Sequence, residues 1–299
     1  MANTTFSGPI RSENGMKLIS KNTTSGLVSD RTVGDYPKDA RRWYLEEWFN
    51  RRPGINANLD QASTVEVQRT LNYDFEALGT NMTSALVTFG ATTGGILATT
   101  AGADQDQAII APHLDDDGTA DTGAITAWSG CQWGTENETH WETSIMLPAI
   151  DNQKVWAGLK LTNDQLVATD ANQAFFKFQT DATNSEAFTD FTKLHFVHSI
   201  GGTDYISQLP ITVAANTPYH LKIKIDSDRK ASIFVNGIQY NVTTTAGSTG
   251  GTAVTTGTTP TAALTDDVDF IPYNGIEAGA AAAEALNTHF VAMSRLVYE

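Results

Sequence analysis

The chain has 299 residues, of which 40% are hydrophobic, and a net charge of −15 at pH 7, so it can bury a sizeable core. Negative charge of this size argues against nucleic acid as a partner, because the phosphate backbone would be repelled. A single cysteine excludes an intramolecular disulfide, and because no apolar run approaches the roughly 20 residues that cross a bilayer, we expect no membrane partner.

The first 34 residues are rich in Asn, Thr, Ser and Gly and contain few large apolar side chains. Such a segment cannot bury enough surface to fold alone. It is therefore either a disordered tail or an extended arm that an assembly partner orders, with Phe6, Ile10 and Arg11 as subunit contacts. Residues 1–60 carry a net charge of +2, whereas residues 61–299 carry −17. We therefore expect an N-terminal arm over 1–60 and a folded body over 61–299.

One helix is predicted at the end of this arm, over about 36–52. Asp35 is a suitable N-cap, Pro37 suits the first turn, and Pro53 with the glycine after it ends the pattern. Helical spacing would align one apolar stripe, which consists of Tyr44, Leu45, Trp48 and Phe49. The stripe either packs on the body or contacts another subunit, since Trp and Tyr are enriched at interface hot spots.

From about residue 64 onward, short segments of alternating apolar and polar residues are separated by turn residues. This pattern is typical of an all-β sandwich or jelly roll. The strands are expected within 64–78, 85–89, 96–99, 107–111, 138–147, 154–161, 174–178, 193–198, 205–207 and 290–297. A Thr, Gly and Ala low-complexity segment over 243–263 predicts a long exposed loop.

The clearest strand signal lies between residues 219 and 241. Leu221, Ile223 and Ile225 alternate with charged residues, which predicts a strand with one buried face. Asn236-Gly237 separates two further apolar runs, and this dipeptide favours a type I′ hairpin because both central positions take positive φ. We therefore expect three consecutive antiparallel strands.

This hairpin carries a family resemblance. The run from Phe234 to Gly237, preceded by Tyr219, Leu221, Ile223 and Asp226, resembles the concanavalin-A-like (laminin-G-like) jelly roll, as do GGILATTAGADQDQAII and WETSIMLPAIDNQKVWAGLKL. The resemblance implies a jelly-roll sandwich over about 65–242 plus the last strand. Lectins, glycanases and structural modules all use this fold, so it does not by itself indicate a function. The N-terminal FSGPIRSENG resembles the start of virion structural proteins of tailed phages.

Glycanases of this fold carry two or three carboxylates on one strand, because an acid and a nucleophile or base must flank the glycosidic bond. The nearest approach here is Glu136, Glu138, His140 and Glu142, which would share one face if the strand begins early enough. The aspartate of the family pattern is absent. We therefore interpret these residues as a solvated acidic face and expect no enzyme activity.

Two other sets of residues are candidates for ligand binding. Asp115, Asp117 and Asp121 stand at alternate positions that suit Ca²⁺, but the bidentate glutamate of a calcium loop is absent. We expect a polar loop there, and no metal or other cofactor. Trp133, Trp141 and Tyr205 are candidates for stacking on sugar rings, and the alternative is that they pack in the core.

These observations together favour a virion structural protein of a tailed phage. We expect an outer capsid decoration (cement) protein, made in the host cytoplasm, whose arm binds the major capsid protein or other virion subunits. Because one arm can fasten on a symmetry mate, a homo-oligomer is expected, most simply a trimer. The alternative is a carbohydrate-binding module of a tail or fibre that recognises a host surface glycan.

Overall fold

The computed structural model describes residues 16–21, 28–33, 42–56, 75–79, 81–90, 94–112, 133–180, 186–247 and 249–297. Over these ranges the regular elements are strands, apart from one short 3-10 helix, η1 (Thr135–Asn137). The chain divides into two compact units, Met1–Trp43 with Leu296–Glu299, and Tyr44–Arg295. In the first unit, β1 (Met16–Lys21) and β2 (Val28–Val33) form an antiparallel pair.

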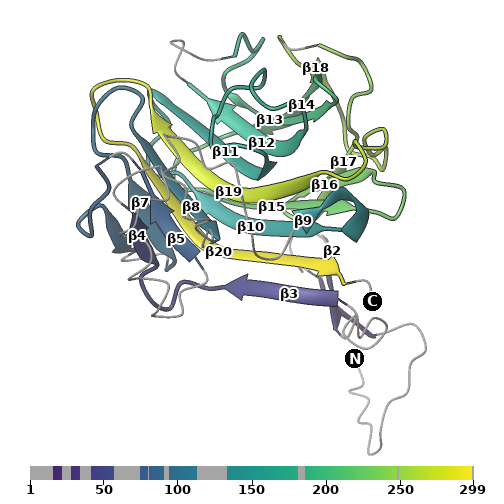
Figure 1. The fold of residues 1–299 in the computed structure, drawn as a ribbon, viewed down its shortest axis with the longest axis horizontal. Coiled ribbons are helices and arrows are strands. Elements are labelled where there is room, and N and C mark those ends of the chain that lie inside the picture. The colour runs from purple at the N-terminus through teal and green to yellow at the C-terminus, as the bar shows by residue number, and fades with distance from the viewer. Residues whose placement is uncertain are drawn as a thin grey trace, which may run out of the picture. The chain divides into compact units, whose positions relative to one another are not determined.

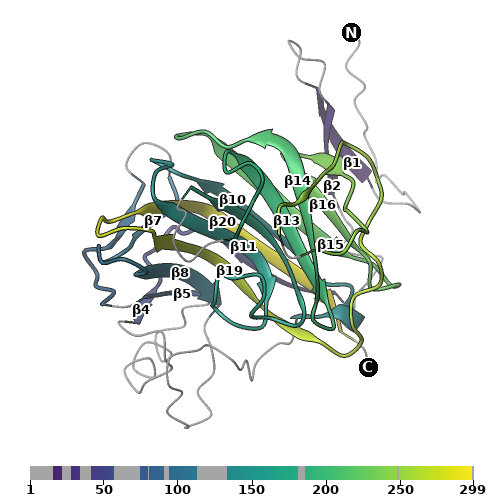
Figure 2. The same cartoon turned by 90° about the horizontal axis from the view of Figure 1, so that it is seen from above.

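The second unit is a sandwich of two large sheets (Figures 1 and 2). The eight-stranded sheet has the order β17-β16-β15-β10-β20-β7-β6, and β3 pairs with β20. Its strands are β3 (Arg42–Glu47), β6 (Val87–Phe89), β7 (Ile96–Thr99), β10 (His140–Met146), β15 (Pro218–Ile225), β16 (Ala231–Val235), β17 (Ile238–Tyr240) and β20 (Ala285–Leu296).

The ten-stranded sheet has the order β18-β14-β13-β12-β11-β19-β8-β5-β4, and β9 pairs with β19. Its strands are β4 (Gly54–Asn56), β5 (Phe75–Leu78), β8 (Gln107–Pro112), β9 (Trp133–Gly134), β11 (Gln153–Lys160), β12 (Gln173–Gln179), β13 (Lys193–Ile200), β14 (Thr203–Thr212), β18 (Thr252–Ala253) and β19 (Asp269–Ala278). The pairs β4–β5 and β14–β18 are parallel, and the other strand pairs of the two sheets for which a register is known are antiparallel. The fold is the predicted all-β jelly-roll sandwich.

The predicted three-stranded segment is confirmed as β15, β16 and β17. Asn236 and Gly237 both have positive φ, 51° and 78°, as a type I′ turn requires. The inward-facing residues Leu221, Ile223 and Ile225 are fully buried and belong to one hydrophobic core with Phe176 and Phe196 of the opposite sheet. Burial of each such side chain stabilises the fold by about 1.5–3 kcal/mol.

The centre of the ten-stranded sheet, at β11 and β12, is buried on both faces, because side chains from the connections after these strands pack on its outer side. Every residue of β11 and β12 is buried. A second apolar cluster lies on this outer face and includes Trp156, Phe175 and Tyr273 from the sheet, with Val167 and Phe188 from the covering segments. The sequences of β11 and β12 therefore contain hydrophobic residues on both faces, together with polar residues that are also buried.

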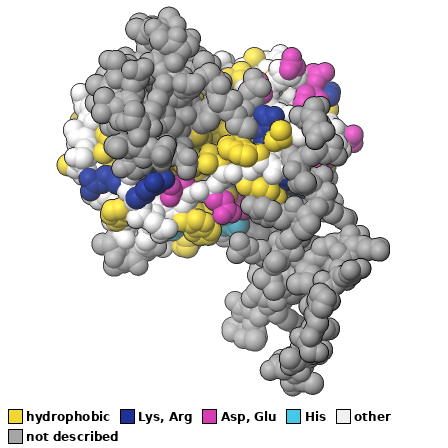
Figure 3. Space-filling model, turned by 60° about the horizontal axis from the view of Figure 1, so that its bottom comes forward, with side chains coloured by type: hydrophobic (Ala, Val, Ile, Leu, Met, Phe, Trp, Pro, Cys, Tyr) yellow, Lys and Arg dark blue, Asp and Glu magenta, His cyan; other side chains and the backbone are white. Residues whose placement is uncertain are grey.

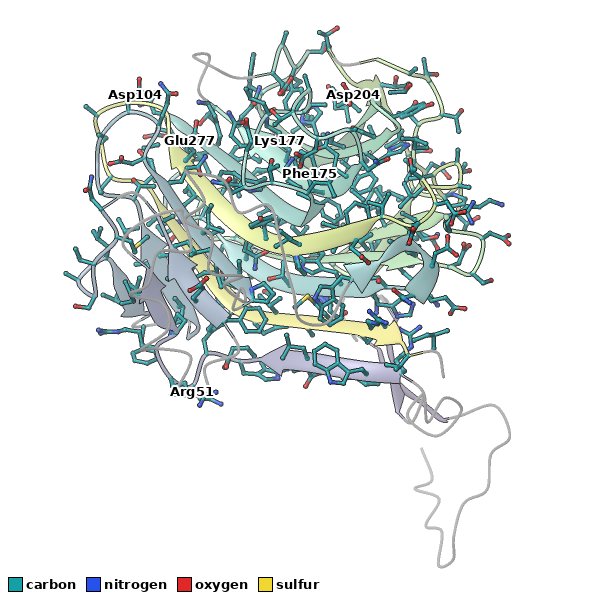
Figure 4. The ribbon with its side chains drawn as sticks, viewed as in Figure 1. Arg51, Asp104, Phe175, Lys177, Asp204 and Glu277 are labelled. Carbon is teal, nitrogen blue, oxygen red and sulfur yellow. The ribbon has the colours of Figure 1, made fainter. Side chains whose placement is uncertain are left out.

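Three fully buried lysines lie in this covered layer, and each contacts a carboxylate. Lys154 Nζ is 2.8 Å from Glu277, Lys160 Nζ is 2.9 Å from Asp170, and Lys177 Nζ is 3.5 Å from Glu186. Figure 4 labels Lys177 and Phe175 of β12 and Glu277 of β19. An ammonium group is stable in such a place only when it is paired and hydrogen-bonded.

The helix predicted over 36–52 is wrong within the described residues, since Arg42–Glu47 is strand β3. β3 lies along β20 (Figure 1), and that pairing supplies hydrogen-bond partners along one edge of β3. Aromatic side chains also favour a pleated, half-buried surface, so the tertiary pairing outweighs the local helical pattern.

The low-complexity segment over 243–263 is mostly exposed, but it is more ordered than a free loop. It contains β18, which pairs in parallel with β14. Isolated β-bridges join Thr256 to Tyr240, the last residue of β17 in the eight-stranded sheet, and Gly250 to Phe188. The segment thus borders both sheets instead of projecting from one.

Candidate functional site: an aromatic and charged patch on the eight-stranded sheet

The outer face of the eight-stranded sheet carries a cluster of aromatic, charged and histidine side chains from three neighbouring strands and the segment after β3. We call it the Trp48 patch, and it consists of Trp48, Glu142, Ser144, His220, Lys222, His289 and Phe290. The strand register explains how it forms. Glu142 of β10 faces Lys222 of β15, and Ser144 of β10 lies between His220 of β15 and Phe290 of β20.

A β-bulge in β20 places two consecutive side chains near β10. The pairing shifts between Ser144, which faces Phe290, and Ile145, which faces Thr288, so His289 is the extra residue. Its Nδ1 lies 3.0 Å from Ser144 Oγ, and burial lowers the pKa of His289. The bulge therefore adds a polar ring beside Phe290 at the surface.

Trp48 forms the aromatic centre of the patch. Its indole stacks on Phe290 with the ring centroids 4.8 Å apart and the planes at 27°, yet 51% of Trp48 remains exposed. Phe49, with a positive φ of 51°, turns the chain immediately after it. This turn buries Phe49, which is 3% exposed and packs edge-on against Phe75, while Trp48 stays at the surface.

Glu142 is the charged centre of the patch. Its Oε2 lies 3.3 Å from Lys222 Nζ and 3.4 Å from His220 Nε2. Burial raises the pKa of the Glu142 carboxyl, but the hydrogen bond from His220 and the charge of Lys222 outweigh that effect and lower it. Glu142 is therefore an ionised acceptor at neutral pH, with the Lys222 ammonium and the His220 imidazole beside it. Figure 3 shows hydrophobic side chains next to acidic and histidine side chains on the face turned toward the reader.

The predicted sugar-stacking residues lie elsewhere. Trp133 and Trp141 are fully buried and belong to the core between the sheets, which is the alternative stated for them, so neither side chain can stack on a sugar at the surface. Tyr205 is half-buried and stacks on His198, with the ring centroids 4.6 Å apart and the planes at 8°. The sequence predicted Trp48 as a subunit contact. Its position beside Phe290 at the surface depends on β3 ending at Glu47, next to β20.

The residues predicted as subunit contacts differ in exposure. Phe49 is buried inside its own chain and is unavailable for a partner, whereas Tyr44 is half-buried and Trp48 is exposed. Phe6, Ile10 and Arg11 lie outside the described residues. The calcium candidates Asp115, Asp117 and Asp121 also lie outside them. Within the described part of the chain, no group of three or more His, Cys, Asp or Glu side chains is arranged to hold a metal ion.

The acidic residues around β10 do not share one strand face. Glu136 lies in η1 and forms an ion pair with Arg229 at 3.2 Å, and Glu138 has a left-handed backbone, φ 45°. Only His140 and Glu142 belong to β10. The four side chains therefore do not form the row on one strand that the sequence allowed.

In the part of the chain that the structure describes, no helix has the length and apolar character needed to cross a membrane.

Comparisons with known proteins add distant likenesses only. The sequence matches no protein-family model and no curated protein. Among solved structures, a protein of unknown function from Shewanella oneidensis MR-1 is 9% identical, with 86% of this chain and 87% of that chain covered and a TM-score of 0.47. A β-glucanase from Bacillus licheniformis is 9% identical, with 86% and 98% covered and a TM-score of 0.41. The metal-free carbohydrate recognition domain of Emp46p is 8% identical, with 79% and 93% covered and a TM-score of 0.39. None is similar enough to carry a function to this chain.

Proposed function

We propose that this protein binds carbohydrate through the Trp48 patch. The observation that carries the proposal is an indole that is 51% exposed and stacked on Phe290, within a surface that also offers an ionised carboxylate and the Lys222 ammonium. An aromatic face packs against the apolar C–H face of a sugar ring, and polar groups around it fix the orientation of the hydroxyls. Glu142 accepts hydrogen bonds from hydroxyls, and Lys222 donates them.

The test is a screen of the full chain on a glycan array, followed by calorimetric titration of any glycan that binds. Trp48→Ala should weaken binding at least about tenfold, because truncating a central aromatic anchor costs about 2 kcal/mol or more. Phe89→Ala is the matched control, since Phe89 is a 48% exposed aromatic on β6. Equal affinity for the Trp48→Ala variant, or no bound glycan, would contradict the proposal.

A different observation favours a second function, that of a virion structural protein. Met1–Trp43 and Leu296–Glu299 form a compact unit of their own, and this unit contains the antiparallel pair β1–β2. We propose that this unit attaches the chain to the major capsid protein or other virion subunits, in a homo-oligomer for which a trimer is the simplest form. In such a particle the sandwich would be a capsid decoration or a glycan-binding appendage.

Mass spectrometry of purified particles tests the virion proposal. A copy number comparable to that of the shell protein supports a capsid decoration. A much smaller number supports a tail or fibre component. Absence from particles contradicts the virion proposal and leaves carbohydrate binding as a separate question.

A further inference from the structure

A lysine, a glutamine and an aspartate meet where β11 ends and β12 begins, in the covered layer of the ten-stranded sheet. The pairing of Leu159 with Ala174 brings the next two residues, Lys160 and Gln173, opposite each other. Lys160 Nζ lies 2.6 Å from Gln173 Oε1 and 2.9 Å from Asp170 Oδ2. Lys160 and Gln173 are 0% exposed and Asp170 is 3% exposed, so the three side chains are shielded from bulk water.

We propose that Lys160 and Gln173 form an intramolecular isopeptide bond, with Asp170 as the group that transfers the proton. In this reaction Asp170 accepts a proton from the Lys160 ammonium, and the neutral Nζ attacks Cδ of the Gln173 carboxamide. The new N–C bond forms as the carboxamide C–N bond breaks. The leaving nitrogen takes the proton held by Asp170 and the proton lost by Nζ. The products are one secondary amide and one ammonium ion, with Asp170 returned to its carboxylate form.

The surroundings orient the glutamine for this reaction. Gln173 Nε2 donates to the Val167 carbonyl at 2.6 Å and to Ser199 Oγ at 2.7 Å, so the carboxamide presents its oxygen to the lysine. Ser199 Oγ in turn donates to Asp204 at 2.6 Å. Because Lys160 Nζ is hydrogen-bonded at 2.6 Å to the oxygen of the carboxamide that it would attack, the reaction gains the large effective concentration of an intramolecular process.

The aspartate is held in position as firmly as the glutamine. Asp170 Oδ2 accepts the backbone N–H groups of Leu161 and Thr162 at 3.1 and 3.2 Å, and Oδ1 accepts the Thr162 hydroxyl at 2.7 Å. Burial lowers the pKa of Lys160, although the neighbouring Asp170 acts in the opposite direction. The Phe175 ring lies 4.5 Å from Nζ. A dry, partly apolar setting of this kind favours the neutral amine that the attack needs.

The same layer contains an internal comparison. Lys177 Nζ lies 2.7 Å from Gln165 Oε1, but the nearest carboxylate contact, to Glu186, is 3.5 Å and Nζ also donates to the Gln165 carbonyl at 2.7 Å. This lysine is engaged by a backbone acceptor and is farther from its proton acceptor. The geometry therefore assigns the bond to Lys160 and not to Lys177.

Mass spectrometry of the full chain tests the proposal. The denatured intact protein should be lighter than its sequence mass by one ammonia molecule, and a proteolytic digest should contain one branched peptide that joins Lys160 to Gln173. The Lys160→Arg variant should have the full mass calculated from its own sequence. The Asp170→Asn variant should be mostly unlinked, whereas the control Lys177→Arg should still be lighter than its calculated mass by one ammonia molecule.

Three results would overturn the inference. These are a wild-type chain at its full sequence mass, a branched peptide that joins Lys177 to Gln165 instead, and linkage in Asp170→Asn as complete as in the wild type. The wild-type digest decides the existence and position of the bond even if the substituted chains fold poorly.

Discussion

Replacement of His198 by phenylalanine should remove a large part of the acid sensitivity of this fold. His198 on β13 is 1% exposed, and its ring is stacked on Tyr205 and lies 5.9 Å from the Phe196 ring. Burial lowers the pKa of His198 to about 3, whereas an imidazole in an unfolded chain titrates near 6.5. Between these values the unfolded chain binds a proton that the folded chain does not.

The sign and size of the effect follow from this difference in pKa. Because the unfolded state binds more protons, the free energy of unfolding falls as the pH drops below 6.5, and the loss continues until the pH approaches 3. At about pH 4.5, two units below the unfolded pKa, one such histidine costs about 3 kcal/mol. Burial lowers the pKa of His195 to about 4, so this residue should add a loss of the same sign. His198→Phe should therefore remove about half of the combined contribution of His195 and His198.

Urea denaturation at about pH 7.5 and about pH 4.5 measures this effect. The control is Tyr205→Phe, which keeps the imidazole and an aromatic ring stacked on it. The fall in unfolding free energy between the two pH values should be the same for this control and the wild type. For His198→Phe it should be smaller by about 3 kcal/mol. An equal fall in all three proteins would refute the reasoning, as would a His198 pKa near 6.5 in an NMR titration of the folded protein.

Two further substitutions test the packing of the ten-stranded sheet. Gly275→Ala should destabilise the fold by about 1–3 kcal/mol in thermal or urea unfolding, because the added Cβ would meet the Trp156 ring; a neutral effect would show that the indole moves aside freely. Glu277→Leu removes the acceptor of Lys154 Nζ at 2.8 Å and of Gln107 Nε2 at 2.8 Å and should cost about 3–5 kcal/mol. Adding Lys154→Met should recover most of that loss, and a double variant no more stable than Glu277→Leu alone would contradict the assignment of the cost to the broken Lys154–Glu277 pair.

Strand β19 shows why local patterns miss an element. It lies between β11 and β8, near the centre of the larger sheet, yet no strand was expected there. Pro272 and Gly275 interrupt its pattern, and both residues normally argue against a central strand. Gly275 is explained by its neighbour, since the Trp156 ring lies where a side chain would be. That contact depends on the pairing of β11 with β19 and is invisible in either segment alone.

The sequence by itself determined the fold class and most of the strands, because period-two alternation and the Asn236-Gly237 turn are local properties with a direct physical cause. Only the tertiary structure decided that residues 42–47 form a strand, since their partner β20 lies at the far end of the chain. It also decided which tryptophans are buried and that Trp48 stacks on Phe290 at the surface. Local spacing determines which side of a strand a residue faces, but which groups share a site depends on strand order and register, which involve residues distant in sequence.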